Sequence, residues 1–116
     1  MVNMHRGDIF LCDFGDPTGS GPGFIRPVII IQDNRFNDSG LATTVALSLT
    51  SNLKYKIHPG CLLLKRHETG LSKDSVVNAT QISTVDKSQL LELVGTLPDD
   101  LMIQVENCMR VVLGMD

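Results

Sequence analysis

A run of β-branched apolar residues, Val28-Ile29-Ile30-Ile31, follows Pro27 and sets the strongest limit on how this chain folds. A strand with one face in water alternates apolar and polar residues, and this run does not alternate. It therefore predicts a central strand that the rest of the protein covers on both faces.

Several other segments also predict strands, and glycine, proline or polar residues bound each of them. They are Asp8–Phe14, Thr44–Thr50, Ile57–Leu64 with a break at Pro59-Gly60, and one strand or two short ones over Ser75–Ala79 and Gln81–Thr84. The break at Pro59-Gly60 suits an edge strand or a bulge. In the segment Thr44–Thr50, apolar side chains occupy one face, so Thr50 lies on the other face among small residues that leave room for a ligand.

Two helices are predicted in the last third of the chain. Asp86 and Gln89 match a capping box, which predicts a short helix over residues 90–94 that ends at Gly95. Pro98-Asp99-Asp100 predicts the start of the last helix, because acidic residues are favourable at that end. Its apolar residues recur at helical spacing: Leu101, Val105, Cys108 or Met109, and Val112. The predicted fold class is mainly β with C-terminal helices (α+β), a small β-barrel or strongly bent sheet with helices on one side.

The length of 116 residues suits one domain, residues 1–116, with its own core. A net charge of −3 argues weakly against a nucleic-acid partner, although a local patch can be basic on an acidic protein. The first residues precede no apolar run long enough for a signal peptide or a membrane span. Cys12, Cys61 and Cys108 lie far apart, which favours reduced thiols acting as small buried hydrophobes in the cytoplasm.

The common catalytic motifs are missing from the sequence. Neither the cysteines nor His5, His58 and His67 show a metal-binding spacing, and none of the three histidines has neighbours that suggest catalysis. The glycines lack the lysine and helix of a phosphate-binding loop. A Ser–His–Asp set stays open by composition, but no Gly-x-Ser-x-Gly elbow marks one.

Arg26 is the residue that the local sequence presents most distinctly. Glycines precede it, and Pro27 favours an extended backbone at Arg26, which gives the side chain a defined direction. A guanidinium offers a planar set of donors that matches phosphate oxygens. The pattern alone supports a structural ion pair and a phosphate ligand equally. Thr50 and Ser51 at a strand end are either turn formers or ligands, and the pattern slightly favours the turn.

The chain resembles the MazF/PemK (Kid) family of toxin endoribonucleases over almost its whole length. The likeness rests on the order and spacing of several fragments, above all an Arg-Pro pair that opens an apolar strand. These are Arg6-Gly7-Asp8-Ile9, Gly23 to Val28, Thr50, Asp74-Ser75-Val76, Gln81 to Lys87, and Gly95-Thr96-Leu97.

This resemblance implies an SH3-like β-barrel of the CcdB/PemK type, which is usually a homodimer. It implies cleavage of single-stranded RNA at a short sequence, without a metal or other cofactor, to 2′,3′-cyclic phosphate and 5′-hydroxyl ends. It also implies a cognate antitoxin whose partly disordered tail lies across the RNA site.

The family's catalytic arginine and threonine fall on Arg26 and Thr50. Gln81 and Ser83 fall on a strand that family members use near the RNA channel. The loop from Thr18 to Phe24 matches a mobile loop beside the family's active site. Family loops often carry a glutamate where this chain has Gly21, so the contacts of that acid are not transferred.

Single-stranded RNA is held by stacking and by local positive charges. Phe24 and Tyr55 are the candidate stacking residues, with Ser51 beside the catalytic threonine, whereas Phe10 and Phe14 are assigned to the core. A set of basic residues is predicted to contact phosphates: Arg35, Lys54, Lys56, Lys65 and Arg66. A solvated loop is an equally good interpretation of Lys54-Tyr55-Lys56. If these side chains do bind RNA, its affinity should fall steeply with added salt.

Two other functions fit the same fold. A gyrase poison resembling CcdB would depend on a tryptophan near the C-terminus, and this chain contains no tryptophan. A non-catalytic binding module would have no need of both Arg26 and Thr50. The nuclease is therefore the favoured function.

Overall fold

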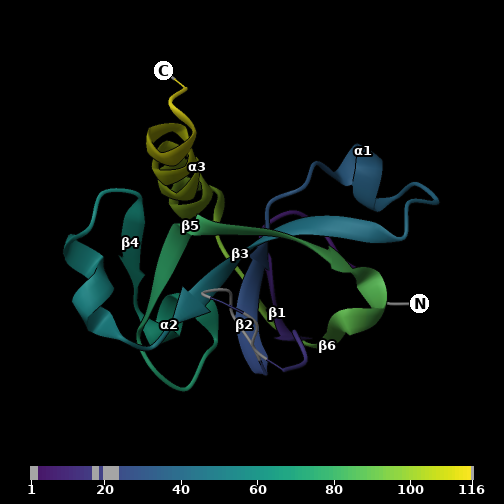
Figure 1. The fold of residues 1–116 in the computed structure, drawn as a ribbon, viewed down its shortest axis with the longest axis horizontal. Helices are drawn as coiled ribbons and strands as arrows, with labels where there is room; N and C mark the ends of the chain where they lie inside the picture. The colour runs from purple at the N-terminus through teal and green to yellow at the C-terminus, as the bar shows by residue number, and fades with distance from the viewer. Residues whose placement is uncertain (1–2, 17–18, 20–23, 116) are drawn as a thin grey trace.

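Among the described residues, six strands form a single antiparallel sheet in the order β4-β5-β3-β2-β1-β6 (Figure 1). The computed structural model describes residues 3–16, 19 and 24–115. The strands are β1 (Asp8–Asp13), β2 (Ile25–Ile30), β3 (Thr43–Thr50), β4 (Cys61–Leu64), β5 (Ser75–Asp86) and β6 (Leu90–Thr96). The helices are α1 (Asn34–Asn37), α2 (Arg66–Thr69) and α3 (Asp99–Leu113), with 3-10 turns η1 (Leu53–Ile57) and η2 (Lys87–Gln89). The predicted fold class, mainly β with a C-terminal helix, is confirmed.

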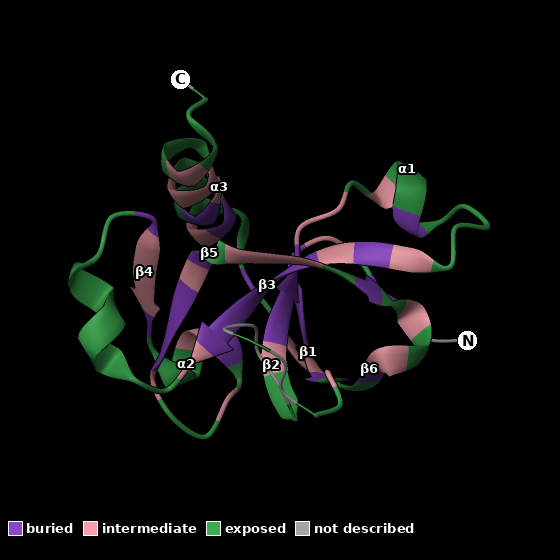
Figure 2. Cartoon of the chain, viewed as in Figure 1, coloured by how far each residue is buried: buried purple, intermediate pink, exposed green. Residues whose placement is uncertain are grey.

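The strand predicted to be covered on both faces is β2, and it lies between β3 and β1. Val28, Ile29 and Ile30 are each 0% exposed. Ile29 belongs to one apolar cluster, which also contains Leu47 and residues of α3. Val28 and Ile30 belong to a second cluster around Phe10. Figure 2 shows the consequence, since β2 is exposed where it begins and buried farther along.

β5 is one continuous strand, which decides between the one-strand and two-strand alternatives. It pairs with β3 along both of its halves, but the register shifts between Leu47 and Ser48, so that residues 79–81 of β5 have no partner on β3. Asn78 Oδ1 accepts hydrogen bonds from the backbone N–H and the hydroxyl of Thr80 within this irregular stretch. Bulges bend strands, and Figure 1 shows β5 curving across the molecule. The sheet is thereby strongly bent, as predicted.

The predicted strand Ile57–Leu64 is too long, because only Cys61–Leu64 forms β4. The residues before it form the 3-10 turn η1 and then reverse direction at Pro59-Gly60, where Gly60 has a φ of +82°. Proline cannot donate to a sheet, and a positive φ favours glycine, so the pair ends any extended pairing. The prediction of an edge strand at this position is confirmed.

The helix predicted over residues 90–94 is wrong. The capping box exists, with the Asp86 N–H donating to Gln89 Oε1 at 2.7 Å, but it opens only the 3-10 turn η2. The chain from Leu90 onward forms β6, which pairs with β1 at the sheet edge. Pairing with β1 satisfies the backbone of this short segment, and such tertiary pairing overrides weak local helix signals.

α3 begins at Asp99, as predicted, with Asp99 and Asp100 in its first turn and Gly114 in the left-handed conformation after its last. Met102 and Val105 are buried against the sheet. The half-buried Leu101, Cys108, Met109 and Val112 pack beside them. Among the described residues, no helix has both the length and the apolar character needed to cross a membrane.

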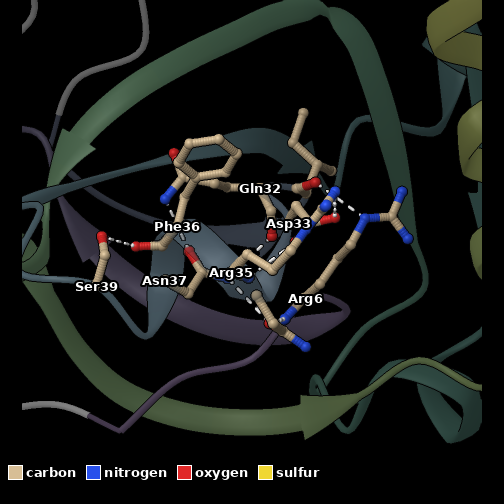
Figure 3. A network of polar contacts seen from close by, with 9 residues as sticks. Arg6, Gln32, Asp33, Arg35, Phe36, Asn37 and Ser39 are labelled. Carbon is tan, nitrogen blue, oxygen red and sulfur yellow. Dashed lines mark hydrogen bonds and ion pairs between the residues drawn. The ribbon is translucent and has the colours of Figure 1, made fainter.

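The short helices α1 and α2 were not predicted, and α1 is held by a polar network (Figure 3). Asn37, a buried residue, donates through Nδ2 to the Gln32 carbonyl at 2.9 Å and accepts from Gln32 Nε2 and the Thr44 hydroxyl, each at 2.9 Å. Arg6 joins the same region to α3, since its Nη2 lies 2.8 Å from Glu106 Oε2. Arg35, a predicted phosphate contact, is paired with Asp33 at 3.0 Å.

Among the described residues, the cysteines are free thiols. Cys12 is fully buried, and burial, aided by the charge of Asp13, raises the pKa of its thiol to about 11. Burial also raises the pKa of Cys61 and of Cys108. A thiol with a raised pKa is a poor nucleophile at neutral pH, which fits the predicted role of small hydrophobes.

Replacing Gly95 by alanine is expected to lower the free energy of unfolding by about 1–3 kcal/mol, the usual cost of overpacking a core. A Cβ at this β6 position would collide with the carbonyl oxygen of Thr69 in α2, a backbone atom that cannot rotate away. Urea unfolding followed by circular dichroism measures the change. Gly40→Ala is the matched control, because a Cβ at residue 40 meets no atom within 4 Å. Equal stability of the two variants would show that β6 and α2 are not held in close contact.

Candidate active site

The pairing of β2 with β3 brings Arg26 and Thr50 together. Val28 lies opposite Ser48 and Ile30 opposite Ala46. This antiparallel pairing brings the beginning of β2, with Arg26, beside the end of β3, with Thr50. The two residues, well separated in the sequence, are therefore neighbours at one end of the sheet.

Arg26 and Thr50 line a hollow of about 520 Å³, called here the first hollow. Residues from β1, β2, the end of β3 and the segment before β5 form its walls. They are Leu11, Phe24, Ile25, Arg26, Pro27, Leu49, Thr50, Ser51, Leu71, Ser72, Lys73 and Ser75. A rigid sheet thus holds both ends of the loops that complete the hollow, an arrangement typical of binding sites.

The polar lining of the first hollow suits an anion. Its charged residues are the cations Arg26 and Lys73, and none of the described residues that line it is acidic. Hydroxyl groups lie beside them on Thr50, Ser51, Ser72 and Ser75. Thr50 Oγ1 accepts the Asn52 N–H at 3.1 Å, an arrangement that leaves the hydroxyl proton to be donated. Guanidinium, ammonium and hydroxyl groups are hydrogen-bond donors that match the oxygens of a phosphate.

Phe24 gives the first hollow an aromatic wall. The residue is 61% exposed, and its backbone has a φ of 60°, a left-handed conformation that is rare for a bulky residue. The Phe24 carbonyl accepts the Phe14 N–H at 2.9 Å, and the Phe24 N–H donates to the Gly15 carbonyl. A strained residue that presents an exposed ring beside a cationic hollow indicates a binding function.

The remaining predicted RNA-binding residues lie outside the first hollow. Lys54, Tyr55 and Lys56 are exposed on η1, where the Tyr55 ring is tilted against His58 with 5.8 Å between the ring centres. Gln81 and Ser83 are half-buried on β5, and Ser83 pairs with Ala46 of β3. The first hollow therefore gathers Phe24 and Ser51 around Arg26 and Thr50, and these five predicted residues lie outside its lining. The predicted phosphate contacts Arg35, Lys65 and Arg66 lie outside it as well.

Lys73, Ser72 and Ser75 line the first hollow but were not predicted to do so. Ser72 and Lys73 lie just before β5, and Ser75 is its first residue. The start of β5 pairs with the end of β3, since Val76 lies opposite Thr50. The only signal in the sequence was the fragment Asp74-Ser75-Val76, which marked the family resemblance without indicating a site. Finding these residues would have required the β3–β5 register.

Part of the predicted site falls on residues that the structure does not describe. Of the loop from Thr18 to Phe24, Thr18 and Gly21 lie outside the described residues, as do positions 20, 22 and 23. Within the part of the chain that the structure does describe, no three side chains of histidine, cysteine, aspartate or glutamate gather in a group that could hold a metal ion.

This chain is similar to known proteins over almost its whole length. Residues 5–113 match the model of the family described as PemK-like, MazF-like toxin of type II toxin-antitoxin system. Endoribonuclease MazF6 of Mycobacterium tuberculosis is 42% identical over 112 residues, which cover 97% of this chain and 98% of that protein.

Two solved structures have the same fold. A MazF structure from Deinococcus radiodurans has a TM-score of 0.79 at 25% identity and covers 97% of each chain. A mycobacterial endoribonuclease in complex with its cognate antitoxin has a TM-score of 0.80 at 24% identity and covers 98% of each chain.

Proposed function

Because this chain belongs to the PemK-like, MazF-like toxin family of type II toxin–antitoxin systems, we propose that it is an endoribonuclease toxin acting on single-stranded RNA. The relative that is 42% identical over almost the full length of both chains is named an endoribonuclease. The finer proposal is sequence-specific cleavage that needs no metal and leaves 2′,3′-cyclic phosphate and 5′-hydroxyl ends.

The observation that supports this proposal is that Arg26 and Thr50 both line the first hollow. RNA already contains its own nucleophile, the 2′-hydroxyl next to each phosphodiester. An enzyme that uses this group needs only to align it, to move protons and to stabilise the charge on phosphorus. Cationic and hydroxyl donors around one anion site provide the last of these, which is usually the largest contribution.

In the proposed reaction, the 2′-oxygen forms a bond to phosphorus while the bond from phosphorus to the 5′-oxygen breaks. Arg26 donates hydrogen bonds to the non-bridging oxygens, and the Thr50 hydroxyl adds another donor. Arginine stays protonated at physiological pH and is therefore no base. We assign to water the removal of the 2′-hydroxyl proton and the return of a proton to the leaving 5′-oxygen.

The walls of the first hollow favour single strands over duplexes. Phe24, Ile25 and Leu11 present apolar surface beside the cations. Bases stack on such surfaces only when they are not already stacked and paired in a helix. Phe24 is the proposed stacking residue for the base next to the scissile phosphate.

We further propose that the toxin is a cytoplasmic homodimer inhibited by a cognate antitoxin. The structure of the mycobacterial relative contains its cognate antitoxin. An acidic antitoxin segment would compete with RNA at the first hollow, because the charges on its described lining are both positive. Copurification with the antitoxin tests the inhibitory complex, and light scattering of the free toxin tests the homodimer.

The deciding experiment incubates the purified protein with RNA in excess EDTA and analyses the new ends. The proposal expects cleavage at one short sequence, with 5′-hydroxyl and 2′,3′-cyclic phosphate ends that sequencing of 5′-hydroxyl ends will locate. Cleavage that EDTA abolishes would contradict metal independence. Intact RNA would contradict the nuclease: trapped gyrase–DNA complexes would then indicate a gyrase poison, and their absence a binding module.

A further inference from the structure

A second hollow of about 470 Å³ adjoins the first. Ser51, Ser72 and Lys73 line both, so one ligand can extend from one to the other without crossing a barrier of other residues. The second hollow adds lining residues from η1, from α2 and from the segment before β5. They are Leu53, Arg66 and Asp74.

The acidic side chains near the second hollow are already engaged. Asp74 Oδ1 accepts the Arg66 N–H at 2.9 Å, and Asp74 Oδ2 lies 3.6 Å from Lys65 Nζ. The backbone bond from Arg66 and the charge of Lys65 hold the pKa of Asp74 below its usual value. Glu68 Oε1 accepts the Lys65 N–H at 2.8 Å and lies outside both linings. The Asp74 charge that faces the hollow is therefore offset by Lys65.

The cations that face the second hollow are not engaged in the same way. Lys73 and Arg66 are exposed, and within the described residues neither side chain forms an ion pair or a side-chain hydrogen bond. The charge of Arg66 helps to lower the pKa of Asp74 without forming an ion pair with it. Lys73 borders both hollows, whereas Arg66 lies only beside the second. From Arg26 outward, the two hollows thus carry positive groups in the order Arg26, Lys73, Arg66.

We propose that the second hollow binds the phosphate that neighbours the scissile one, with Arg66 as its main ligand and Lys73 between the two phosphates. The inference rests on the proposed function, since it extends the same RNA strand beyond the first hollow. A single strand carries a negative charge at every nucleotide, so a strand whose scissile phosphate lies at Arg26 must place its next charge nearby. The shared hydroxyls of Ser51 and Ser72 border the path between them.

This subsite contributes affinity and positioning, not sequence recognition, because phosphate contacts are the same for every base. A minimal substrate therefore needs one phosphate beyond the scissile one, and a dinucleotide is cleaved poorly. Each phosphate contact that is removed should reduce the salt dependence of binding, with the slope of log affinity against log salt falling by about 0.7 for single strands.

The test combines two variants with two kinds of substrate. The substrates are oligoribonucleotides with the mapped cleavage sequence, either all phosphate or with one uncharged methylphosphonate directly 5′ or directly 3′ of the scissile position. The two methylphosphonate substrates reveal on which side the second hollow holds the strand. The variants are Arg66→Gln and Lys73→Gln, and kcat/KM is measured for each pair.

On the all-phosphate substrate, each variant is expected to lower kcat/KM about two- to fivefold, within the range that one exposed charge pair contributes. On one of the two methylphosphonate substrates, Arg66→Gln should have no further effect, because its partner is already uncharged. Arg110→Gln is the matched control: it removes one positive charge from α3, where Arg110 is hydrogen-bonded to Asn107.

An Arg66→Gln effect of equal size on all three substrates would overturn the inference, as would the absence of any effect. Lys73→Gln is the second variant, because Lys73 lines both hollows whereas Arg66 lines only the second. A loss of kcat/KM with Lys73→Gln but not with Arg66→Gln would assign Lys73 to the scissile phosphate and refute the subsite. In each of these cases the wild-type protein still cleaves RNA, so the proposed function stands. Failure of the wild type to cleave any substrate would contradict the proposed function itself.

Discussion

Replacement of Arg26 by glutamine is expected to lower the single-turnover rate of RNA cleavage about 10²–10³-fold, the usual cost of losing one donor to a developing negative charge. Arg26 is exposed at the start of β2, so the substitution removes the guanidinium without opening a cavity in the core. The measurement is the rate at saturating enzyme with an end-labelled RNA, and an unchanged melting temperature shows that the variant is folded.

Arg26→Lys separates the shape of the group from its charge. Lysine keeps the charge but loses the planar pair of donors, so the same large loss is expected if Arg26 binds two phosphate oxygens at once. Arg110→Gln removes a cation from α3, which contributes no residue to the first hollow, and this variant should cleave at the wild-type rate. Cleavage by Arg26→Lys at close to the wild-type rate would refute the two-point contact and leave only a charge effect.

The parts of the fold that sequence predicted well are those that depend on burial alone. Local sequence patterns predict both the run Val28–Ile31 and the apolar face of α3. A strand covered on both faces contains few polar residues, and a helix packed on one face has apolar residues at helical spacing. The helix begins where it was expected, and β2 contains Val28–Ile30 but begins at Ile25 and ends before Ile31. The two-sided cover of β2 in turn requires a bent sheet, which the irregular middle of β5 provides.

The errors lie where a neighbour decides the structure. Residues 90–94 carry a true capping box before them, yet they form β6 because the edge of β1 offers a backbone partner. The chain before Cys61 was assigned to a strand, although Pro59-Gly60 ends the pairing. No local pattern contains the identity of the adjacent strand, which is set by the register of the whole sheet.

Some residues of the candidate site could likewise be predicted from the sequence, and others depend on how the strands pair. Arg26 stood out locally through its glycines and Pro27, and the family resemblance pointed to Thr50. The shared hollow, by contrast, depends on the β2–β3 register and on the start of β5 beside the end of β3. Only the pairing of β5 with β3 brings Lys73 to the site. In the sequence, a lysine between serine and aspartate does not indicate a binding residue.

Replacement of Thr50 by valine is expected to lower the cleavage rate constant kcat about 10²-fold and to leave KM nearly unchanged. Valine matches the shape of threonine but has no hydroxyl, so the donor facing the scissile phosphate is lost while the wall of the first hollow keeps its form. If the hydroxyl interacts more strongly with the transition state than with bound RNA, the loss falls on kcat.

Thr50 also has a structural contact that the experiment must separate from catalysis. Its Oγ1 accepts the Asn52 N–H at the turn into η1, so Thr50→Val also removes one hydrogen bond, worth about 1 kcal/mol of stability. Thr50→Ser keeps the hydroxyl for both tasks and is expected to restore most of the rate. A Thr50→Val enzyme that melts at a lower temperature yet retains wild-type kcat would assign this residue to the turn alone and leave Arg26 without its hydroxyl partner.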